Sequence, residues 1–528
     1  MKPFDSNGAF QFNPTEVRRR AIVGAGSTLL SAVSALGIQV ISTIVLARLL
    51  SPSDFGLIAM VSTFSALLVN WGPNGFTEAV LQADEINHAL ASNLFWINVG
   101  TSFLLAAMFA ASGSLLALFY GDHRVVGVAV GMSVPILVNC LAVQHIALLK
   151  RAMCFPVVSA NDVVARFVSV AVAILLGCAG WGYWALVAGA TALPLSTSIG
   201  AWFLCRWVPG LPRRRVGTAR MVRFALHTYG RFSANYFANN TDNLLVGWRF
   251  GASSLGFYKK AYDLFSLPMA MSTAPLTNVA VSALSRLRGD LAKYTRYLLR
   301  AAALVAFVGM ALSADLTLVG KDVIRLLLGP GWEPAGYMMN FFGPGIGIML
   351  LYYMHGWIHL SIGRADRWFR WGMIEAGITF LLFIVGLPWG PVGVAVAWTV
   401  SFFLLTGPAF WYAGRPIQLG FGPVLAVVWR YMAAAVLAGG ASAGIARGTF
   451  LSAPAPTAMA AFLRIVITSL LFVLLYLAAV IVLHQTYAPI YQVVSVVKEM
   501  CPPGMFSKPT SDAVVPYVGD PKAVPTSD

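Results

Sequence analysis

The sequence predicts an all-α integral membrane protein of about fourteen transmembrane helices. Of its 528 residues, 58% are hydrophobic and only 11% are charged, and the mean hydropathy is +0.75. A soluble domain carries roughly a quarter charged residues, so a chain this apolar could not cover its own surface with polar groups. Apolar stretches long enough to span a bilayer, about 20 residues each, recur along almost the whole chain.

The individual helices follow from apolar runs bounded by Gly, Pro and charged residues. Residues 1–20 form a polar cytoplasmic leader, and the apolar run after it is too long for a cleavable signal peptide. The proline-rich tail, 487–528, is expected to be a disordered cytoplasmic segment. Between them the predicted helices are 21–49, 55–81, 91–118, 124–148, 157–178, 183–206, 218–248, 253–285, 291–319, 333–361, 366–386, 390–413, 424–446 and 458–486.

Three turn motifs occur twice, in the same order. Residues 50–57 match 250–257 at an offset of 200, and both Tyr120-Gly121 and Trp181-Gly182 recur 208 positions later, as Leu328-Gly329 and Trp389-Gly390. These matches suggest that the first six helices are repeated as the next six. Chance Gly and Pro matches in apolar sequence are the alternative.

The repeat predicts two six-helix lobes, 21–207 and 218–413, joined by a basic cytoplasmic linker, 208–217. Because six is even, both lobes start on the same side of the membrane, as in transporters built from parallel repeats. The helices of 414–486 are then an appended pair.

The distribution of the 36 basic residues sets the orientation. With both termini in the cytoplasm, the cytoplasmic ends and loops hold 24 of them and the outer loops hold six. This bias is the one that membrane insertion produces. The net charge of +16 is therefore explained by the excess of basic residues on the cytoplasmic side, and no nucleic-acid partner is needed to explain it.

Polar side chains inside the predicted helices point to a cavity, because a charge at bilayer depth costs roughly 2.5–3.5 kcal/mol unless it faces protein or water. Helix 218–248 carries five such residues spaced by four, four, four and three, which places them on one face. They are His227, Arg231, Asn235, Asn239 and Asp242. Five polar residues on one face favour a cavity lining over a single packing contact.

Other predicted helices carry shorter polar sets. Candidate cavity residues are Asn70, Asn74 and Glu78 beside a kink expected at Gly72-Pro73, Lys259 and Lys260 on helix 253–285, and Arg166 on helix 157–178. Helix 366–386 carries Glu375. Lys259 with Asp263, and Asp162 with Arg166, have the i, i+4 spacing of intrahelical ion pairs, so a packing role is the alternative for those two pairs.

No pattern indicates an enzyme, a metal site or a cofactor. His355 and His359 have the i, i+4 spacing of zinc ligands, but no third ligand accompanies them. There is no GxxxxGK[ST] loop for ATP hydrolysis. Energy would have to come from a gradient, and the coupling ion, proton or sodium, stays open.

Several stretches resemble the Wzx-type polysaccharide flippases, in particular the WzxC-like branch of the multidrug/oligosaccharidyl-lipid/polysaccharide exporter superfamily. They are Leu46–Leu57, Thr241–Gly247, Ser254–Tyr262 and Ala283–Leu287, and the resemblance runs from about residue 20 to 485. Only Asp242 and the region from Lys259 to Tyr262 match a recurrent motif of the family.

The resemblance implies a bacterial inner-membrane protein with two lobes around a cationic central cavity, working by alternating access. The implied cargo is an undecaprenyl-diphosphate-linked oligosaccharide repeat unit, flipped toward the periplasm for exopolysaccharide, lipopolysaccharide or capsule synthesis. Membrane lipids, a polymerase and a chain-length regulator are the implied partners.

Two other functions stay open. An ion-coupled drug or metabolite exporter of the same fold would favour a smaller, acidic cavity, whereas Arg166, Arg231, Lys259 and Lys260 favour an anionic cargo. A membrane glycosyltransferase or polymerase would usually need a long outer loop with catalytic residues. The longest predicted outer loop, near 319–333, holds only Lys321, Asp322, Arg325 and Glu333 as charged residues.

Overall fold

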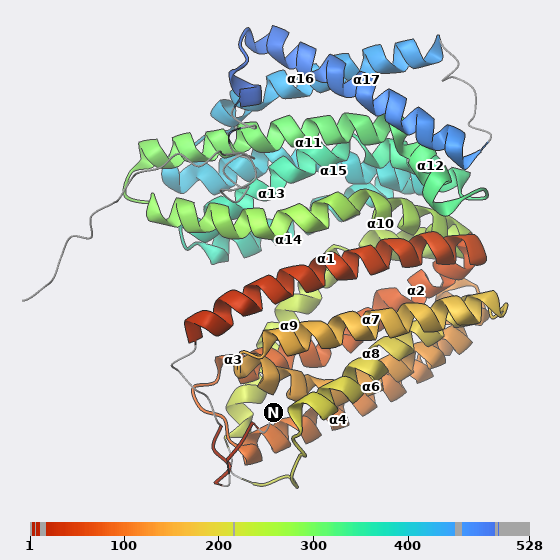
Figure 1. Cartoon of the computed structure of the whole chain (residues 1–528), viewed down its shortest axis with the longest axis vertical. Coiled ribbons are helices and arrows are strands. Elements are labelled where there is room, and N and C mark those ends of the chain that lie inside the picture. Colours follow the sequence, from red (N-terminus) through yellow and green to blue (C-terminus); the bar gives the residue numbers. More distant parts are fainter. Residues whose placement is uncertain are drawn as a thin grey trace, which may run out of the picture.

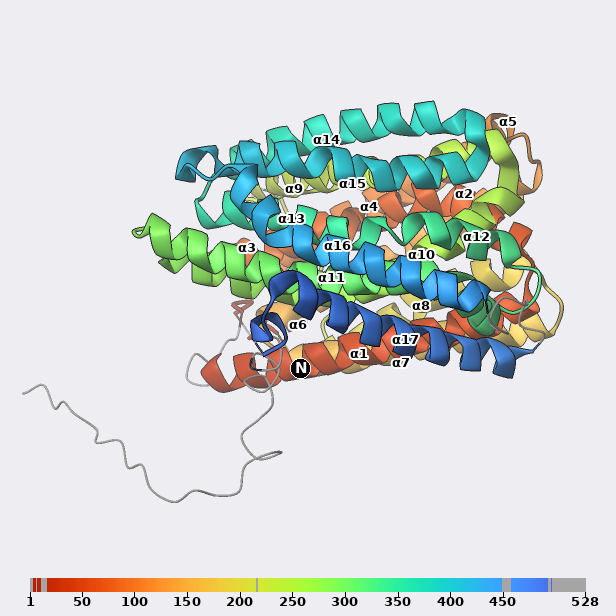
Figure 2. The same ribbon diagram turned by 90° about the horizontal axis from the view of Figure 1, so that it is seen from above.

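The computed structural model describes residues 3–5, 7–10, 17–214, 217–448, 457–491 and 495. The side chains of Val17, Arg231, Ala234, Ala238 and residues 268–275 lie outside that description, as does most of the predicted tail. In the described part, regular structure is helical apart from two isolated bridges. The helices run side by side as an N-terminal half and a C-terminal half stacked on it (Figures 1 and 2).

The N-terminal half holds the elements that precede the basic linker. They are α1 (Val17–Leu49), α2 (Pro52–Val69), the π-helical turn η2 (Pro73–Thr77), α3 (Glu78–Gln82), α4 (His88–Ala111), α5 (Gly113–Tyr120), α6 (Arg124–Arg151), α7 (Phe155–Cys178) and α8 (Tyr183–Cys205).

The elements after the linker form the C-terminal half and the appended pair. They are α9 (Thr218–Ala238), α10 (Thr241–Arg286), α11 (Leu291–Leu328), α12 (Glu333–Phe342), α13 (Gly345–Ser361), α14 (Ala365–Gly386), η3 (Leu387–Trp389), α15 (Gly390–Gly414), η4 (Arg415–Ile417), α16 (Phe421–Arg447) and α17 (Ala458–His484).

The prediction of an all-α membrane protein is confirmed. Each of the fourteen predicted intervals is occupied by helix, and the short turns at 179–182 and 387–389 lie where they were predicted. Among the described residues, ten helical segments are long and apolar enough to cross a membrane, one of which, Ala365–Ile417, covers two predicted helices. The chain is therefore a multi-pass membrane protein, and the count of fourteen crossings stays a prediction.

One predicted loop is wrong. The outer loop expected near 319–333 is largely helical, because α11 continues to Leu328. Asp322 lies on this extension, and its carboxylate accepts a charge-assisted hydrogen bond of 2.8 Å from the Arg464 guanidinium of α17. A charged residue inside a membrane helix is stable when it pairs with a residue on a neighbouring helix, so the charge of Asp322 does not require a loop at this position.

The helix pair at the end of the chain packs on the C-terminal half. Both α16 and α17 contact α11 and each other, and they form the uppermost layer in Figure 1. Ser469 on α17 donates a hydrogen bond of 3.1 Å to Asp315 on α11. Polar contacts thus fasten the appended helices to the second half.

The two ends of the bundle differ. We call the end where α1 begins and α6 ends the leader end, and the opposite end, where α1 ends and α2 begins, the seam end. At the leader end the described leader residues pack beside α4: the His88 amide donates to Gly8 O at 3.0 Å, and the Phe4 ring lies 5.6 Å from the His88 ring. The leader predicted as a polar extension is therefore partly docked.

Candidate transport site

The two halves meet at a backbone-to-backbone crossing of α2 and α10. A Cβ atom on Gly56 would lie 1.6 Å from Ala252 O, and one on Gly256 would lie 1.9 Å from Pro52 O. These four positions are pairs at the offset of 200 predicted for the repeat, so each half presents the same two positions to the other. Only glycine permits an approach this close.

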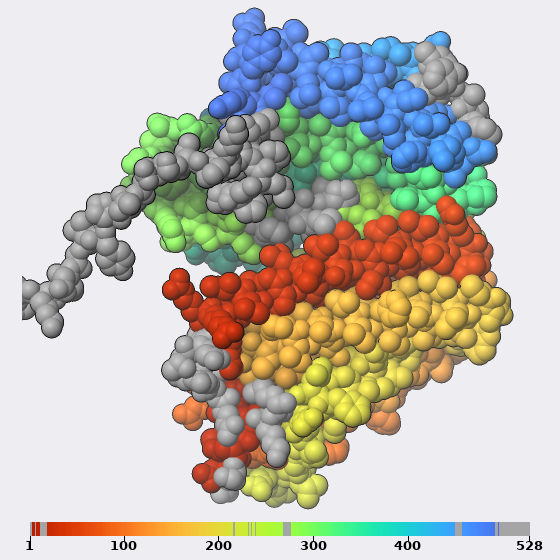
Figure 3. All heavy atoms as spheres, viewed as in Figure 1, coloured from red at the N-terminus to blue at the C-terminus, as the bar shows by residue number. Residues whose placement is uncertain are grey.

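Side chains close the same end of the interface. Trp332, between α11 and α12, is 1% exposed, and its indole nitrogen donates to Ala47 O on α1 at 3.0 Å. Its ring lies 5.6 Å from Phe55 of α2. Arg48 donates to Leu326 O at 2.9 Å. We call these contacts and the glycine crossing the seam, and α1 touches the C-terminal half there in the space-filling view (Figure 3).

A cluster of cations lies one turn beyond Gly256 on α10. The Lys260 side chain is 9% exposed, and its ammonium lies 4.3 Å from the centroid of the Phe55 ring in the other half. Among the described residues Lys260 makes no ion pair. A buried cation over an aromatic face is held by cation–π attraction and keeps its charge available at the boundary between the halves.

Lys259 differs from Lys260 in having a partner. Its ammonium lies 2.9 Å from the Asp263 carboxylate, at the predicted i, i+4 spacing. The structure thus contains the self-sufficient ion pair that was the alternative to a cavity role. Lys259 is also 5.4 Å from the centroid of the Tyr262 ring.

The polar stripe predicted on helix 218–248 is broken after Ala238. Asn239 caps α9, and α10 begins at Thr241. Asn239 and Asn240 donate from their side chains to the carbonyls four residues back, at 2.8 and 2.9 Å. Such bonds compete with the backbone ladder, which explains why the helix ends where sequence periodicity predicted it would continue.

The members of the stripe consequently have different surroundings. His227, Asn235 and Asn239 are exposed on α9, whereas Asp242 is 4% exposed and accepts a hydrogen bond of 2.9 Å from Tyr258. The Arg231 side chain lies outside the described residues. The single face predicted for all five residues therefore does not reach Asp242, which is buried inside the C-terminal half.

The helix α9 connects the two halves. It contacts η2, α3 and α4 of the N-terminal half, passes behind α1 in Figure 1, and leads into α10. The Tyr229 hydroxyl donates to Leu67 O at 2.8 Å, and the Tyr229 ring packs edge-on against Trp71 at 4.8 Å. The aromatic side of α9 thus faces the N-terminal half, and its polar residues point elsewhere.

The polar set of helix 55–81 lies where the predicted kink occurs. The helix is interrupted between Val69 and Pro73 and continues as a π-helical turn. Asn70 and Asn74 are joined by a hydrogen bond of 3.2 Å, and Glu78 begins α3. Because η2 packs on α9, the structure brings this set beside the helix that carries His227 and Asn235.

Arg166 is not brought to this group. It lies on α7, which packs on α1 and α8, and its guanidinium binds Asp162 at 2.9 Å. Sequence reasoning also missed Phe55 and Trp332, which bridge the halves. The turn Gly329-Pro330-Gly331 before Trp332 was a signal that could have pointed to a fixed aromatic there.

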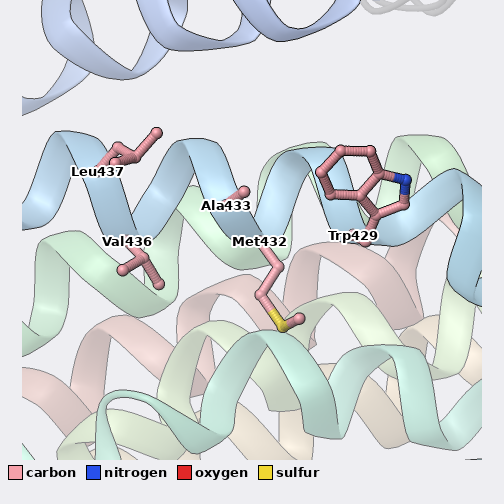
Figure 4. A pocket seen from close by; sticks show the side chains of 5 residues that line it. All are labelled: Trp429, Met432, Ala433, Val436 and Leu437. Atoms are coloured by element: carbon pink, nitrogen blue, oxygen red, sulfur yellow. The ribbon is translucent and has the colours of Figure 1, made fainter.

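A shallow apolar groove lies on α16, away from the seam. It is lined by Trp429, Met432, Ala433, Val436 and Leu437 (Figure 4). Val436 is 70% exposed and Leu437 is 59% exposed. No polar side chain lines this groove, so it is suited to lipid tails and offers nothing to a charged group.

The chain is similar to known polysaccharide biosynthesis proteins. The model of a family described as polysaccharide biosynthesis protein matches residues 45–336. The succinoglycan biosynthesis transport protein ExoT of Rhizobium meliloti is 22% identical over 80% of this chain and 86% of its own length. The lipopolysaccharide biosynthesis protein WzxC of Escherichia coli is 21% identical over 74% of this chain and 79% of its own.

Solved structures agree on the fold. A lipid II flippase, MurJ, in an inward closed conformation superposes with a TM-score of 0.68 at 13% identity, covering 88% of this chain and 99% of that one. An inward-facing MATE-family multidrug transporter gives a TM-score of 0.56 at 13% identity, covering 73% and 94%. At these identities the likeness concerns the architecture alone.

Proposed function

The chain belongs to the polysaccharide biosynthesis protein family, and on that premise we propose that it flips undecaprenyl-diphosphate-linked oligosaccharide repeat units from the cytoplasmic to the periplasmic leaflet. The matched relatives are named as polysaccharide transport and biosynthesis proteins, and the fold is that of flippases and exporters. The polymer would be an exopolysaccharide, a lipopolysaccharide or a capsule, made in the bacterial inner membrane beside a polymerase and a chain-length regulator.

The observation that carries the proposal is the seam. The halves are joined at one end by contacts that pair repeat-related positions, Gly56 with Ala252 and Gly256 with Pro52, while the exposed polar residues of α9 lie away from that crossing. Two similar bodies joined at one end can alternate between opening toward either side of the membrane. The seam is then the closed periplasmic side of a cytoplasm-facing state.

The anionic diphosphate of the cargo accounts for the cations. Lys260 is buried at the boundary between the halves without an acidic partner among the described residues. We assign the same role to Arg231, which has no acidic residue at i±3 or i±4 in the sequence. A guanidinium binds a diphosphate through bidentate hydrogen bonds that an ammonium cannot reproduce.

Deleting the gene tests the function itself. Polymer yield should vanish while lipid-linked repeat units accumulate on the cytoplasmic side of the membrane. Accumulation on the periplasmic side would point to a polymerase instead. A normal polymer yield in a strain with no second flippase would rule the proposal out.

Locking the seam tests the alternating-access step. In a variant with Ala47→Cys and Trp332→Cys, a short bifunctional thiol reagent should stop export, and a cleavable reagent should allow recovery after reduction. Cysteines at Ala173 and Gly189, on neighbouring helices of the N-terminal half, serve as the matched control, because a Cβ on Gly189 would lie 2.9 Å from the Ala173 Cβ. Full export from the cross-linked seam variant would show that the seam does not open.

Reporter fusions test the proposed orientation. Fusions after residues 215 and 388 should report opposite sides, cytoplasmic and periplasmic, with both chain termini in the cytoplasm. If both fusions reported the same side, the fourteen-crossing topology and the parallel repeat would fail together.

A further inference from the structure

The C-terminal half buries a group of ionisable side chains that the seam does not use. Tyr352, His355 and His359 occupy positions i, i+3 and i+7 of α13, which places them on one face of that helix. His355 is 3% exposed and His359 is 0% exposed. Their rings lie 5.9 Å apart.

The neighbouring helix α14 presents a matching series. Arg367, Trp371 and Glu375 follow one another at steps of four. The Trp371 indole donates to the Tyr352 hydroxyl at 2.8 Å, and the Glu375 carboxyl group lies beside that hydroxyl. At the other end of the series, Arg367 lies 4.3 Å from the centroid of the Tyr412 ring of α15.

Three of the four histidine ring nitrogens in this group have no hydrogen-bond partner among the described residues. His355 Nδ1 bonds to Tyr352 O at 2.6 Å, but its Nε2 and both nitrogens of His359 are buried without a hydrogen bond among the described residues. A neutral imidazole has one donor and one acceptor to satisfy, and buried polar groups are normally paired. A packing role therefore leaves three nitrogen atoms unexplained.

The N-terminal half shows what a packing histidine looks like. His145 is 0% exposed, and its two ring nitrogens lie 3.1 Å from Leu141 O and 3.0 Å from Trp207 O. Its ring stacks on Trp202 at 4.4 Å. Both nitrogens are used to hold neighbouring segments together, in contrast to those of His355 and His359.

The chemistry of the group restricts its ligand. Among the described residues no cluster of three or more His, Cys, Asp and Glu side chains could hold a metal ion. His355 and Glu375 both lie against Tyr352, and His359 is one turn beyond His355 on α13. Imidazole and carboxyl groups have in common the ability to take up and release a proton.

We propose that His355, His359 and Glu375 form a proton-binding site inside the C-terminal half, and that the proton exchanged there is the ion that drives transport. The first statement stands independently, whereas the second rests on the proposed function. The two imidazoles take up one proton between them, because two positive charges this close in a buried site repel each other.

The groups that face the site set how it responds to pH. The charged side chains closest to His359 on α14 are Arg367 and Asp366. The tyrosines beside the site are Tyr352 and Tyr353 of α13, Tyr294 of α11 and Tyr412 of α15. The Tyr294 hydroxyl lies 2.7 Å from Ser361 Oγ. Arg288, before α11, donates to Ser361 O at the end of α13. Residues 276–285 of α10, which contact α13 through Thr277 and Ser285, include no titratable side chain, and α12 carries Glu333 and Tyr337.

A route from this site to the seam is present in the packing. Trp357, between the two histidines on α13, donates from its indole to the Thr277 hydroxyl of α10 at 2.9 Å, and α10 also carries Gly256. A change of charge beside α13 therefore acts on the helix that crosses α2. This gives protonation a physical means of biasing the seam toward its open or closed form.

Proton binding is tested on the purified full-length protein in lipid nanodiscs, without any cargo. With ring-15N-labelled histidine, nuclear magnetic resonance spectra between about pH 4 and 9 should contain a titrating signal that disappears in both His355→Gln and His359→Gln. His145→Gln is the matched control and should leave that signal in place. Infrared difference spectra should lose a carboxyl band in Glu375→Gln, which keeps the test valid if a histidine variant does not fold.

The outcomes separate the two statements. If no histidine signal is lost in either variant and no carboxyl band is lost in Glu375→Gln, the site binds no proton and the proposal is overturned. If proton binding is present, Glu375→Gln should reduce polymer export at least tenfold at normal abundance. Wild-type export by that variant would overturn the coupling alone, and normal export after gene deletion would overturn the flippase function while leaving proton binding intact.

Discussion

The two halves of the molecule differ in the partners of several charged and titratable side chains. In the N-terminal half, His145 has a partner for each ring nitrogen, Arg151 donates to three backbone carbonyls, and Arg166 binds Asp162. In the C-terminal half, Lys260 and His359 are buried without an ion-pair partner among the described residues. The two halves therefore use these side chains differently.

This difference has a physical meaning. Burying a charge or a polar group without a partner costs free energy, so such groups persist where they bind something. Partnered groups, in contrast, hold helices together. Substitutions of buried groups that have partners should therefore lower abundance. Substitutions of Lys260 and His359, which have no ion-pair partner among the described residues, should lower export at normal abundance.

The largest effect should come from the one place where the halves are equivalent. Gly56→Val or Gly256→Val puts a side chain where a Cβ alone would lie within 2 Å of a carbonyl oxygen, so α2 and α10 must separate. Export should fall to background in both variants. Gly37→Val on α1, where a Cβ meets nothing within 4 Å, is the control for a β-branched residue in a helix. Export by either seam variant at the level of Gly37→Val would show that the crossing is not needed.

The next effect separates the halves. Lys260→Met removes the buried cation and keeps the length of the side chain, so polymer export should drop about tenfold, the equivalent of roughly 1.4 kcal/mol of binding. Arg166→Met in the N-terminal half should change export by less than about twofold, because its charge is already paired at the surface of α7. Polymer yield is measured beside membrane abundance. Equal losses of export in Lys260→Met and Arg166→Met would contradict the proposed difference between the two halves.

A third effect concerns the appended helices. Asp322 and Arg464 have side chains 10% and 21% exposed, so Asp322→Ala removes the carboxylate from a largely buried guanidinium at a cost of about 3 kcal/mol. Thermal unfolding in detergent should shift to lower temperature and abundance should fall. Ser469→Ala, which removes only the hydroxyl bound to Asp315, should cost about 1 kcal/mol. No difference between the two variants would mean that the ion pair does not fasten α17.

The sequence predicted the positions of the helical segments well, but it predicted less well where each helix ends or continues. Apolar runs bounded by Gly, Pro and charged residues placed each of the fourteen intervals. The offset of 200 matched residues 50–57 with 250–257, but the sequence did not predict that Gly56 and Gly256 meet in the seam. It did not predict that α9 ends at Ala238, because asparagine side chains bonding to the backbone compete locally with the helix. It also could not show that α11 extends past Asp322, since the partner, Arg464, lies 142 positions away.

The candidate site was predictable only in part. Polar spacing identified Lys260 and the residues of α9, and the pairs Lys259–Asp263 and Asp162–Arg166 formed at the spacing that predicts them. Trp332 and Phe55 were missed because an aromatic residue in an apolar chain carries no periodic signal. His355 and His359 were noted only for metal spacing. That three of their four ring nitrogens have no partner among the described residues is a property of packing, which one sequence does not contain.

The smallest effect concerns the turns that correspond in the repeat. After Tyr120-Gly121 the N-terminal half uses an ion pair, Asp122 with Arg124 at 2.8 Å, whereas after Leu328-Gly329 the C-terminal half places Trp332 in the seam. The Arg124 side chain is 46% exposed, so solvent screening limits the pair to about 0.5 kcal/mol or less. Asp122→Asn should therefore lower the unfolding temperature only slightly and leave export unchanged. Trp332→Ala, which removes the indole from the seam, should lower export.

The pH dependence of that small effect has a definite sign. The hydrogen bond from Arg124 lowers the pKa of the Asp122 carboxyl below its ordinary value, so the folded protein binds this proton less readily than the unfolded chain does. The stabilisation is fully present above the ordinary pKa of about 4 and is lost as the pH falls through the lower, folded-state pKa. Wild type and Asp122→Asn should differ at neutral pH and converge in acid. A difference that grew in acid would contradict the pairing, and a loss of export in Asp122→Asn would mean that this turn, like its counterpart at Trp332, takes part in closing the seam.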